Sequence, residues 1–341
     1  MKIATLQLAP KLGDVEGNIE KANALIQSSK TLSVEEGKPD ILVLPELALT
    51  GYNFSSLEEI KPYLEPAGDG PSASWARETA KRLQCKVCVG YPEIEKDSQN
   101  PDQATCYNSL LIVDETGEVI HNYRKSFLYY TDETWAAEGQ VERGYKELEI
   151  QEKQVATSFG ICMDINPYKF EAPYTKWEFA TRVLDSQSQL VILSMAWLTL
   201  LGREELDTLK HKPEMDTFNY WIQRFWPLLQ KKMKHEVDID GTKTTVSPKK
   251  IVIVFANRSG EEPSAGETKP PARYAGTSAI IAVTQKPTAD SDLDTDSSSD
   301  AELPLDVKIL CWDLMGAGEE GICFADTTQD PKMVFAMKKS V

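Results

Sequence analysis

The chain has 341 residues, of which 41% are hydrophobic and 9% aromatic, so it can bury a sizeable core as an ordinary globular protein. Its formal net charge of −16 argues against binding to nucleic acid, because phosphate contacts need a basic surface. No apolar run approaches the roughly 18 residues of a membrane-spanning helix, and the N-terminal segment has the pattern of a strand, not of a signal or transit peptide. We therefore expect a protein of the cytosol or nucleus, with neither membranes nor nucleic acids as partners.

Cysteine and histidine usage favours neither disulfides nor a metal centre. The six cysteines are expected to be reduced thiols, given the size of the chain and the missing secretory pattern. Cys85 and Cys88 have the Cys-x-x-Cys spacing, but they lie in an apolar run and no second pair matches them. With only three histidines in the chain, we predict no bound metal and no other cofactor.

Strands and helices alternate along the chain. Apolar runs and period-2 patterns predict strands over residues 2–9, 41–44, 86–90, 107–113, 118–124, 156–161, 190–193, 251–255, 277–283, 307–312 and 321–325. Helical spacing predicts helices over residues 14–30, 72–83 and 174–185, the second of them capped by Ser72. The Asp-Glu-Thr-Gly sequence at 114–117 is the clearest hairpin signal. This alternation predicts an α/β layered sandwich, and the hairpin argues against a purely parallel sheet.

Two later segments depart from this pattern. Residues 215–229 are rich in aromatic side chains, which fits a helix packed on both sides or a lid over a pocket; core packing is the favoured interpretation. Residues 285–304 are acidic and rich in serine, which predicts a disordered loop, and composition does not reveal a role for its acidic part, 290–302. Because strands resume after this loop, residues 1–341 are predicted to form a single domain.

Three chemically distinctive residues each follow a predicted strand: Glu46, Lys125 and Cys162. Strand ends are where catalytic groups collect in layered α/β folds. A carboxylate in a dry pocket can deprotonate a thiol, and the same carboxylate can return the proton to a leaving ammonia. A lysine can stabilise the anionic oxygen that forms, together with a backbone N–H such as that of Met163. The three residue types together therefore fit the attack of sulfur on an amide.

Each of these residues also has a simpler interpretation. A lone cysteine is usually a buried hydrophobe, and charged residues at strand ends are usually exposed. A Cys–His pair with His121 is conceivable, although His121 lies on a strand only four residues before Lys125. A non-catalytic binding or scaffold protein that inherited the fold is a further alternative, against which the intact Glu–Lys–Cys set argues.

Three segments resemble, in the same order, the motifs of the carbon–nitrogen hydrolase (nitrilase) superfamily: Leu44–Glu46, Tyr123–Lys125 and Gly160–Asp164. The resemblance implies a four-layer α-β-β-α sandwich and a catalytic triad of Glu46, Lys125 and Cys162. It also implies a second carboxylate shortly after the lysine that orients the substrate, and both Asp132 and Glu133 lie in range.

Longer segments resemble the fungal N-terminal amidases within that superfamily: residues 45–52, 123–129, 162–170, 195–198 and 219–225. This resemblance implies an amidohydrolase that converts an N-terminal Asn or Gln of a peptide or protein to Asp or Glu through a thioester, in protein turnover by N-terminal degradation signals. The α-ammonium group of such a substrate calls for a further carboxylate, and Asp132, Glu133 and Asp164 are the candidates.

The alternative within the superfamily is an amidase that acts on a small free amide or carbamoyl compound. The preference between Asn and Gln is not fixed by the sequence, and neither is the choice between monomer and homodimer.

Overall fold

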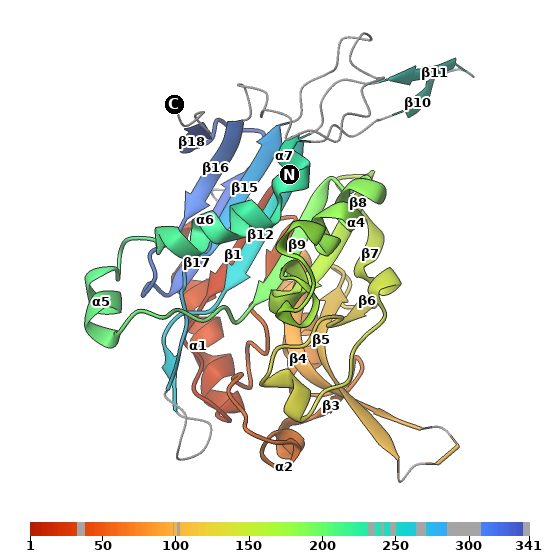
Figure 1. Cartoon of the computed structure of the whole chain (residues 1–341). Helices are drawn as coiled ribbons and strands as arrows, with labels where there is room; N and C mark the ends of the chain where they lie inside the picture. Colours follow the sequence, from red (N-terminus) through yellow and green to blue (C-terminus); the bar gives the residue numbers. More distant parts are fainter. Residues whose placement is uncertain are drawn as a thin grey trace.

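Two seven-stranded sheets packed face to face form the centre of the molecule (Figure 1). The computed structural model describes residues 1–32, 38–97, 99–100, 103–230, 236–239, 242–245, 250–263, 271–284 and 308–336. The loop predicted at 285–304 lies outside the described residues.

The first sheet is mixed, with the order β17-β1-β2-β4-β5-β6 and with β3 paired to β4. Its strands are β1 (Lys2–Gln7), β2 (Ile41–Val43), β3 (Glu65–Pro66), β4 (Lys86–Lys96), β5 (Ala104–Val113), β6 (Val119–Arg124) and β17 (Gly321–Asp326). β1, β2 and β4 are parallel, while β4, β5 and β6 pair as antiparallel neighbours. The hairpin predicted around residues 114–117 is thus confirmed.

The second sheet has the order β18-β16-β15-β12-β9-β8-β7. Its strands are β7 (Tyr145–Ile150), β8 (Lys153–Ile161), β9 (Leu190–Met195), β12 (Lys250–Asn257), β15 (Ala279–Thr284), β16 (Lys308–Leu314) and β18 (Met333–Ala336). β8, β9 and β12 are parallel, and the remaining pairs are antiparallel. Two short hairpins lie outside both sheets: β10 (Glu236–Ile239) with β11 (Thr242–Thr245), and β13 (Glu261–Glu262) with β14 (Ala272–Arg273).

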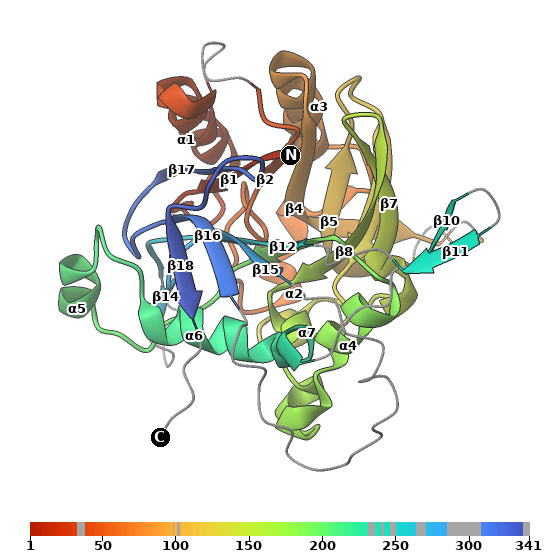
Figure 2. The same cartoon turned by 90° about the horizontal axis from the view of Figure 1, so that it is seen from above.

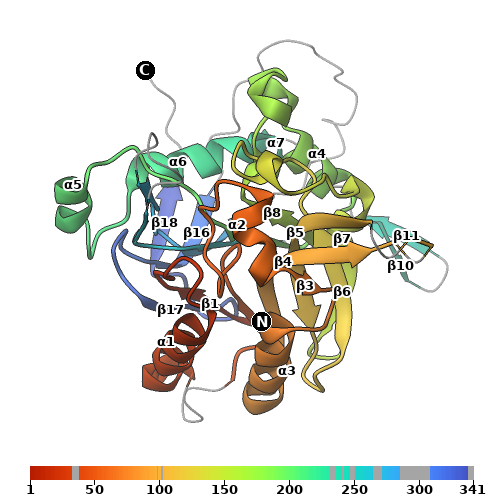
Figure 3. The ribbon, with the colours of Figure 1, turned by 90° about the horizontal axis from the view of Figure 1, so that it is seen from below.

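Helices cover the outer faces of the two sheets, which makes four layers when the molecule is seen from above (Figure 2). The helices are α1 (Val15–Ser28), α2 (Leu57–Ile60), α3 (Pro71–Leu83), α4 (Glu178–Asp185), α5 (Arg203–Thr208), α6 (Met215–Arg224) and α7 (Trp226–Gln230). α1 and α3 lie on one side and α4, α6 and α7 on the opposite side, as the view from below also shows (Figure 3). The predicted α-β-β-α sandwich is confirmed. Within the described residues, no helix is long and apolar enough to cross a membrane.

The alternating pattern of the first strand assigns its side chains to two different layers. Ile3 belongs to the apolar cluster that includes the second sheet. Ala4 and Leu6 belong to the cluster that packs under α1 and α3. Because successive side chains of a strand point to opposite faces, both faces of β1 are buried, and its polar residues Thr5 and Gln7 are buried with them.

Two helix predictions are corrected by the structure. Gly70 caps α3, with Pro71 at its first position; the Ser72 hydroxyl instead donates to Glu65 Oε1 at 2.7 Å. The helix predicted from residue 174 begins at Glu178, because Trp177 has a left-handed backbone with φ of 44°.

The aromatic segment 215–229 forms two helices rather than one. Its most buried rings pack on the second sheet, where Trp221 stacks on Phe255 with ring centroids 5.0 Å apart. Tyr220 is only partly buried and instead lines a cavity described below. Core packing, the favoured interpretation, is confirmed for one face of α6, but the helix is not packed on both sides, since Asn219 and Gln223 are exposed.

Gly90 lets the turn after β2 approach β4 closely. A Cβ atom on Gly90 would lie 2.7 Å from the carbonyl oxygen of Pro45 and 2.8 Å from Cα of Glu46. Both neighbours are backbone atoms and cannot rotate away. The amide of Ala48 also donates to the Gly90 carbonyl at 3.1 Å, which fixes the turn against the strand.

Replacing Gly90 with Ala should destabilise the fold by about 1–3 kcal/mol, the usual cost of overpacking a well-packed site. The free energy of unfolding, measured by urea titration, checks this. Gly202→Ala is the control, since a Cβ there would meet only a Glu205 carboxylate oxygen, at 3.4 Å. Its cost should be limited to the weaker capping preference of Ala, about 1 kcal/mol or less. If Gly90→Ala were as stable as the wild type, the close approach of the turn at Pro45 and Glu46 to Gly90 would be contradicted.

Candidate active site

Glu46 lies where the two sheets meet. It follows β2, and its amide N–H donates to the carbonyl of Met195 at the end of β9, with an N–O distance of 3.4 Å. The hydroxyl of Ser194 donates to the carbonyl of Leu44 at 2.9 Å, which joins the same two strand ends again. The Glu46 side chain is fully buried. Its position therefore depends on the packing of one sheet against the other.

Lys125 is fully buried between two carboxylates. Its Nζ lies 2.6 Å from Oε1 of Glu46 and 2.6 Å from Oδ2 of Asp132. Asn108, on β5, donates from Nδ2 to the same two side chains, at 2.7 Å to Glu46 Oε1 and 3.0 Å to Asp132 Oδ1. Asp132 also accepts from the amide of Tyr129 at 2.9 Å. These contacts hold the four side chains in one network.

Burial and charge act in opposite directions on this network. Burial alone would lower the pKa of Lys125, but the neighbouring carboxylates of Asp132 and Glu46 outweigh it and raise that pKa. Lys125 therefore stays charged at neutral pH. Burial raises the pKa of Glu46, against the lowering effect of Lys125, and the charge of Asp132 raises it further. A raised pKa makes Glu46 a stronger base than an exposed glutamate.

Cys162 is the first residue after β8 and has a backbone φ of 41°. A positive φ is strained for a residue other than glycine, and such strain is concentrated at functional sites. Cys162 begins the short 3₁₀ turn η5 (Cys162–Ile165), and Met163 is its second residue. Backbone N–H groups in the first turn of a helix have no acceptor within it, so the amide of Met163 can serve a bound anion.

The thiol and the buried carboxylate share one backbone donor. The amide of Ala196, just after β9, donates to Glu46 Oε2 at 2.8 Å and also hydrogen-bonds to the Cys162 thiol. Burial and the charge of Glu46 raise the pKa of Cys162 well above its ordinary value, although Lys125 and the Ala196 amide act against them. At neutral pH the sulfur is therefore a thiol, and it needs a base to become a nucleophile.

Asp164 acts as a brace behind the cysteine. Its Oδ1 accepts from the amides of Ser126 at 3.1 Å and Phe127 at 2.8 Å. Its Oδ2 accepts from the amide of Ile161 at 2.7 Å and from the Tyr123 hydroxyl at 2.8 Å. All these donors belong to the protein, and Asp164 does not line the cavity beside Cys162. The structure therefore gives no support to Asp164 as a contact of a substrate amine.

The remaining sequence candidates are separated by the structure. Asp132 is fully buried and bonds to Lys125, whereas Glu133 is exposed. His121 bonds through Nε2 to the carbonyl of Arg143 at 2.8 Å and does not line the cavity, so it is not paired with Cys162. The described part of the chain holds no group of three His, Cys, Asp or Glu side chains that could bind a metal. All six cysteines are free, as predicted.

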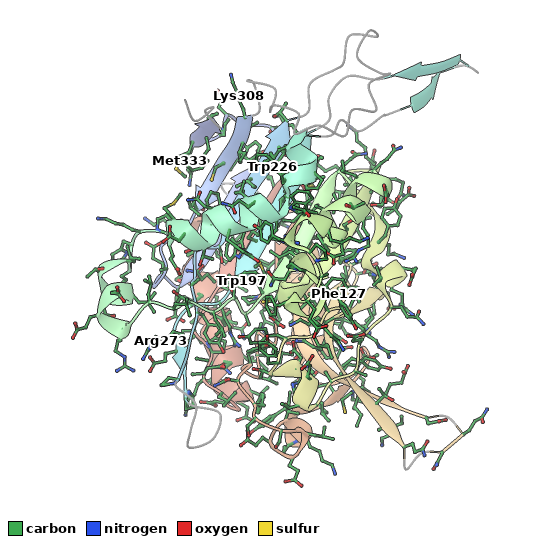
Figure 4. The ribbon with its side chains drawn as sticks, in the orientation of Figure 1. Phe127, Trp197, Trp226, Arg273, Lys308 and Met333 are labelled. Carbon is green, nitrogen blue, oxygen red and sulfur yellow. The ribbon has the colours of Figure 1, made fainter. Side chains whose placement is uncertain are left out.

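A cavity of about 470 Å³ opens in front of Cys162. Trp197, labelled near the middle of the molecule in Figure 4, is one of its walls. The lining residues come from five segments of the chain: Tyr52; Tyr129; Cys162, Met163, Asn166 and Phe170; Ala196 to Leu201; and Glu214, Asp216, Thr217 and Tyr220. The Tyr220 hydroxyl donates to Asn166 Oδ1 at 2.6 Å, which ties α6 to the loop after the cysteine.

Sequence reasoning missed three parts of this site. Asn108 lies within a predicted strand, and the one indication in the sequence was that its polar side chain precedes an apolar run. Ala196 contributes a backbone N–H, which no side-chain pattern reveals. Glu214 precedes a helix and has the appearance of an ordinary capping residue in the sequence.

Comparison with known proteins agrees with the geometry. The family profile for carbon–nitrogen hydrolases matches residues 2–168. A protein N-terminal amidase of Schizosaccharomyces pombe is 32% identical over 299 residues, covering 84% of this chain and 92% of the relative. A protein N-terminal amidase of Saccharomyces cerevisiae is 30% identical over 299 residues, covering 67% of this chain and 64% of that longer relative.

Solved structures show the same fold. A crystal structure of an N-terminal amidase with an Asn-Glu-Ala peptide has a TM-score of 0.72 at 24% identity, and the match covers 99% of both chains. Another, with a Gln-Gly peptide, has a TM-score of 0.71 at 24% identity and covers 95% of this chain and 96% of the other. Together with the fold and the sequence relatives, these findings show that the chain belongs to the carbon–nitrogen hydrolase family.

Proposed function

We propose that this protein is an amidohydrolase that removes the side-chain amide from an N-terminal Asn or Gln, giving Asp or Glu and ammonia. One observation carries the proposal: the buried Lys125 Nζ lies 2.6 Å from Glu46 Oε1, and Cys162, near this pair, lines a cavity. The substrate follows from the sequence relatives, which are protein N-terminal amidases. It follows also from two similar crystal structures of N-terminal amidase, which hold peptides that begin with Asn or Gln. Such an activity would feed protein turnover through N-terminal degradation signals.

In the first half of the proposed reaction, Glu46 removes the thiol proton as the sulfur of Cys162 attacks the amide carbon. The amide oxygen becomes an anion, which the Lys125 ammonium group and the Met163 amide stabilise. Lys125 has three N–H donors, and the two carboxylates use two of them, which leaves one for this oxygen. Glu46 then gives its proton to the nitrogen, the C–N bond breaks, and ammonia leaves a thioester on Cys162.

In the second half, water replaces the thiol as the nucleophile. Glu46 takes a proton from the water as it attacks the thioester carbon, and Lys125 again faces the anionic oxygen. The C–S bond breaks, the sulfur recovers a proton from Glu46, and the new carboxylic acid leaves and loses its proton to water. No cofactor takes part, because every proton moves between substrate, water, Cys162 and Glu46.

We also infer that the chain acts as one catalytic domain in the cytosol or nucleus. Both sheets contribute to the site, since Glu46 and Lys125 follow strands of the first and Cys162 follows a strand of the second. The six free thiols fit a reducing compartment.

The proposed substrate is tested by ammonia release from short peptides that begin with Asn, Gln, Asp or Ala, from N-acetylated Asn peptides and from free glutamine. We expect ammonia from the free Asn and Gln peptides alone, because the others lack a primary amide, a free α-ammonium group or a peptide bond. Cys162→Ala should abolish release and leave the melting temperature close to that of the wild type. Equal rates on the acetylated peptide would instead indicate a small-amide amidase.

The role of Asp132 predicts a shift in the pH profile. Glu46 must be ionised to act as a base, so kcat/KM should fall as the pH drops through its raised pKa. Asp132→Asn removes a negative charge that raises the pKa of Glu46. It also leaves Glu46 as the one ionic partner of Lys125 in the described site. Both effects lower the pKa of Glu46. The acid limb should move to lower pH, and kcat should fall because the base is weaker.

Glu133→Gln is the matched control, since Glu133 is the adjacent carboxylate in sequence and is exposed. Its pH profile should coincide with that of the wild type. An acid limb that stays in place in Asp132→Asn, or moves to higher pH, would contradict the assigned coupling between Asp132 and Glu46.

A further inference from the structure

Glu214 places a buried carboxylate in the cavity that holds Cys162. Its residue surface is 9% exposed, and it immediately precedes α6. Its backbone is fixed at both ends: the amide donates to the Thr277 hydroxyl at 2.9 Å, and the carbonyl accepts from the amide of Phe218 at 3.1 Å. The side chain is therefore held at one wall of the cavity.

This carboxylate has no positively charged partner among the described residues. The hydroxyls of Thr199 and Thr217 hydrogen-bond to it, while its Oε2 atom is buried and has no hydrogen-bond partner. In the part of the chain that the structure describes, the one charged group that acts on it is another acid, Asp216. A buried carboxylate without a counter-charge is costly to keep in a fold. Its place in a ligand cavity suggests that a ligand supplies the missing charge.

The rest of the cavity also suits a cation. The described residues that line it include the acids Glu214 and Asp216 but no lysine, arginine or histidine. The rings of Trp197 and Tyr220, whose centroids are 5.6 Å apart, add the negative faces of two aromatic systems. The other buried carboxylates near the site already have protein partners, as described for Asp132 and Asp164. Glu214 is therefore the buried carboxylate of the cavity that remains for the substrate, since Asp216 is exposed.

We propose that Glu214 binds the α-ammonium group of the N-terminal Asn or Gln, and thereby restricts the enzyme to free N-termini. The inference rests on the proposed function. In Asn only two carbon atoms separate the α-nitrogen from the amide carbon, and in Gln three, so both groups must occupy the one cavity. Acetylation would remove the positive charge and leave Glu214 buried and unpaired. A site built for a polar group rejects a ligand that lacks it more strongly than an apolar pocket does.

The test compares two substrates on two proteins. One substrate is an Asn-Gly-Ala peptide, and the other is its desamino analogue, in which hydrogen replaces the α-ammonium group and the primary amide is kept. Glu214→Gln should lower kcat/KM for the Asn peptide about 10- to 150-fold, the factor that corresponds to one charge-assisted hydrogen bond. Its kcat/KM for the desamino analogue should equal or exceed that of the wild type, and melting temperatures should agree.

A pH series distinguishes binding of the α-ammonium group from a purely structural role of Glu214, because a structural role would not depend on the charge of the substrate. The advantage of the wild type on the Asn peptide should shrink as the pH rises through about 8, where the α-ammonium group loses its proton. Glu171→Gln is the charge-matched control, because Glu171 is an exposed acid one residue beyond Phe170 on the rim of the cavity. It should preserve the ratio of the two substrates.

The outcomes separate the inference from the function on which it rests. An equal loss on both substrates, or full activity of Glu214→Gln on the Asn peptide, would overturn the role of Glu214 while wild-type ammonia release still upheld the function. A wild type that releases no ammonia from the Asn peptide would overturn both. Direct binding of the Asn peptide to Cys162→Ala, weakened by the same factor in Cys162→Ala/Glu214→Gln, would support the inference without turnover.

Discussion

The site depends on one constraint, which is the burial of the Lys125 ammonium group. A cation out of contact with water is tolerated only when opposite charges and hydrogen bonds replace its hydration. Glu46 and Asp132 supply the charges, and Asn108 links the two carboxylates to each other. These residues come from separate elements, so the network also fixes the turn after β2, the end of β6 and the loop that follows it. Loss of one carboxylate would leave the Lys125 ammonium group with one ionic partner instead of two.

The cysteine is held by different means, through the backbone. Its strained φ is maintained because Asp164 ties the residue before it to the loop that follows Lys125. The Ala196 amide then contacts both the thiol and Glu46. Glu46 and Cys162, the proposed base and nucleophile, therefore meet only where β2 of one sheet and β8 and β9 of the other end together. This dependence explains why neither sheet alone contains the reactive pair.

Charge is distributed unevenly through the cavity. Behind its inner end, the ammonium group of the fully buried Lys125 lies between the carboxylates of Glu46 and Asp132. Burial raises the pKa values of Glu46 and Cys162 there. At the wall formed by α6, Glu214 has no balancing cation in the described structure. A molecule with a neutral amide at one end and an ammonium group at the other matches this distribution. The carbon–nitrogen hydrolase chemistry and the proposed selection of free N-termini thus use separate parts of one cavity.

The sequence by itself determined the layered sandwich and predicted the three candidate residues Glu46, Lys125 and Cys162. Short continuous apolar runs indicate strands that are buried on both faces, and Glu46, Lys125 and Cys162 each follow a predicted strand. Tertiary structure alone decided between Asp132 and Glu133, which are neighbours in the chain but differ in burial. It also assigned Asp164 to bracing and brought Glu214 to the cavity wall. The physical reason is that these roles depend on donors and charges from distant segments, whose approach is set by packing and has no local signature in the sequence.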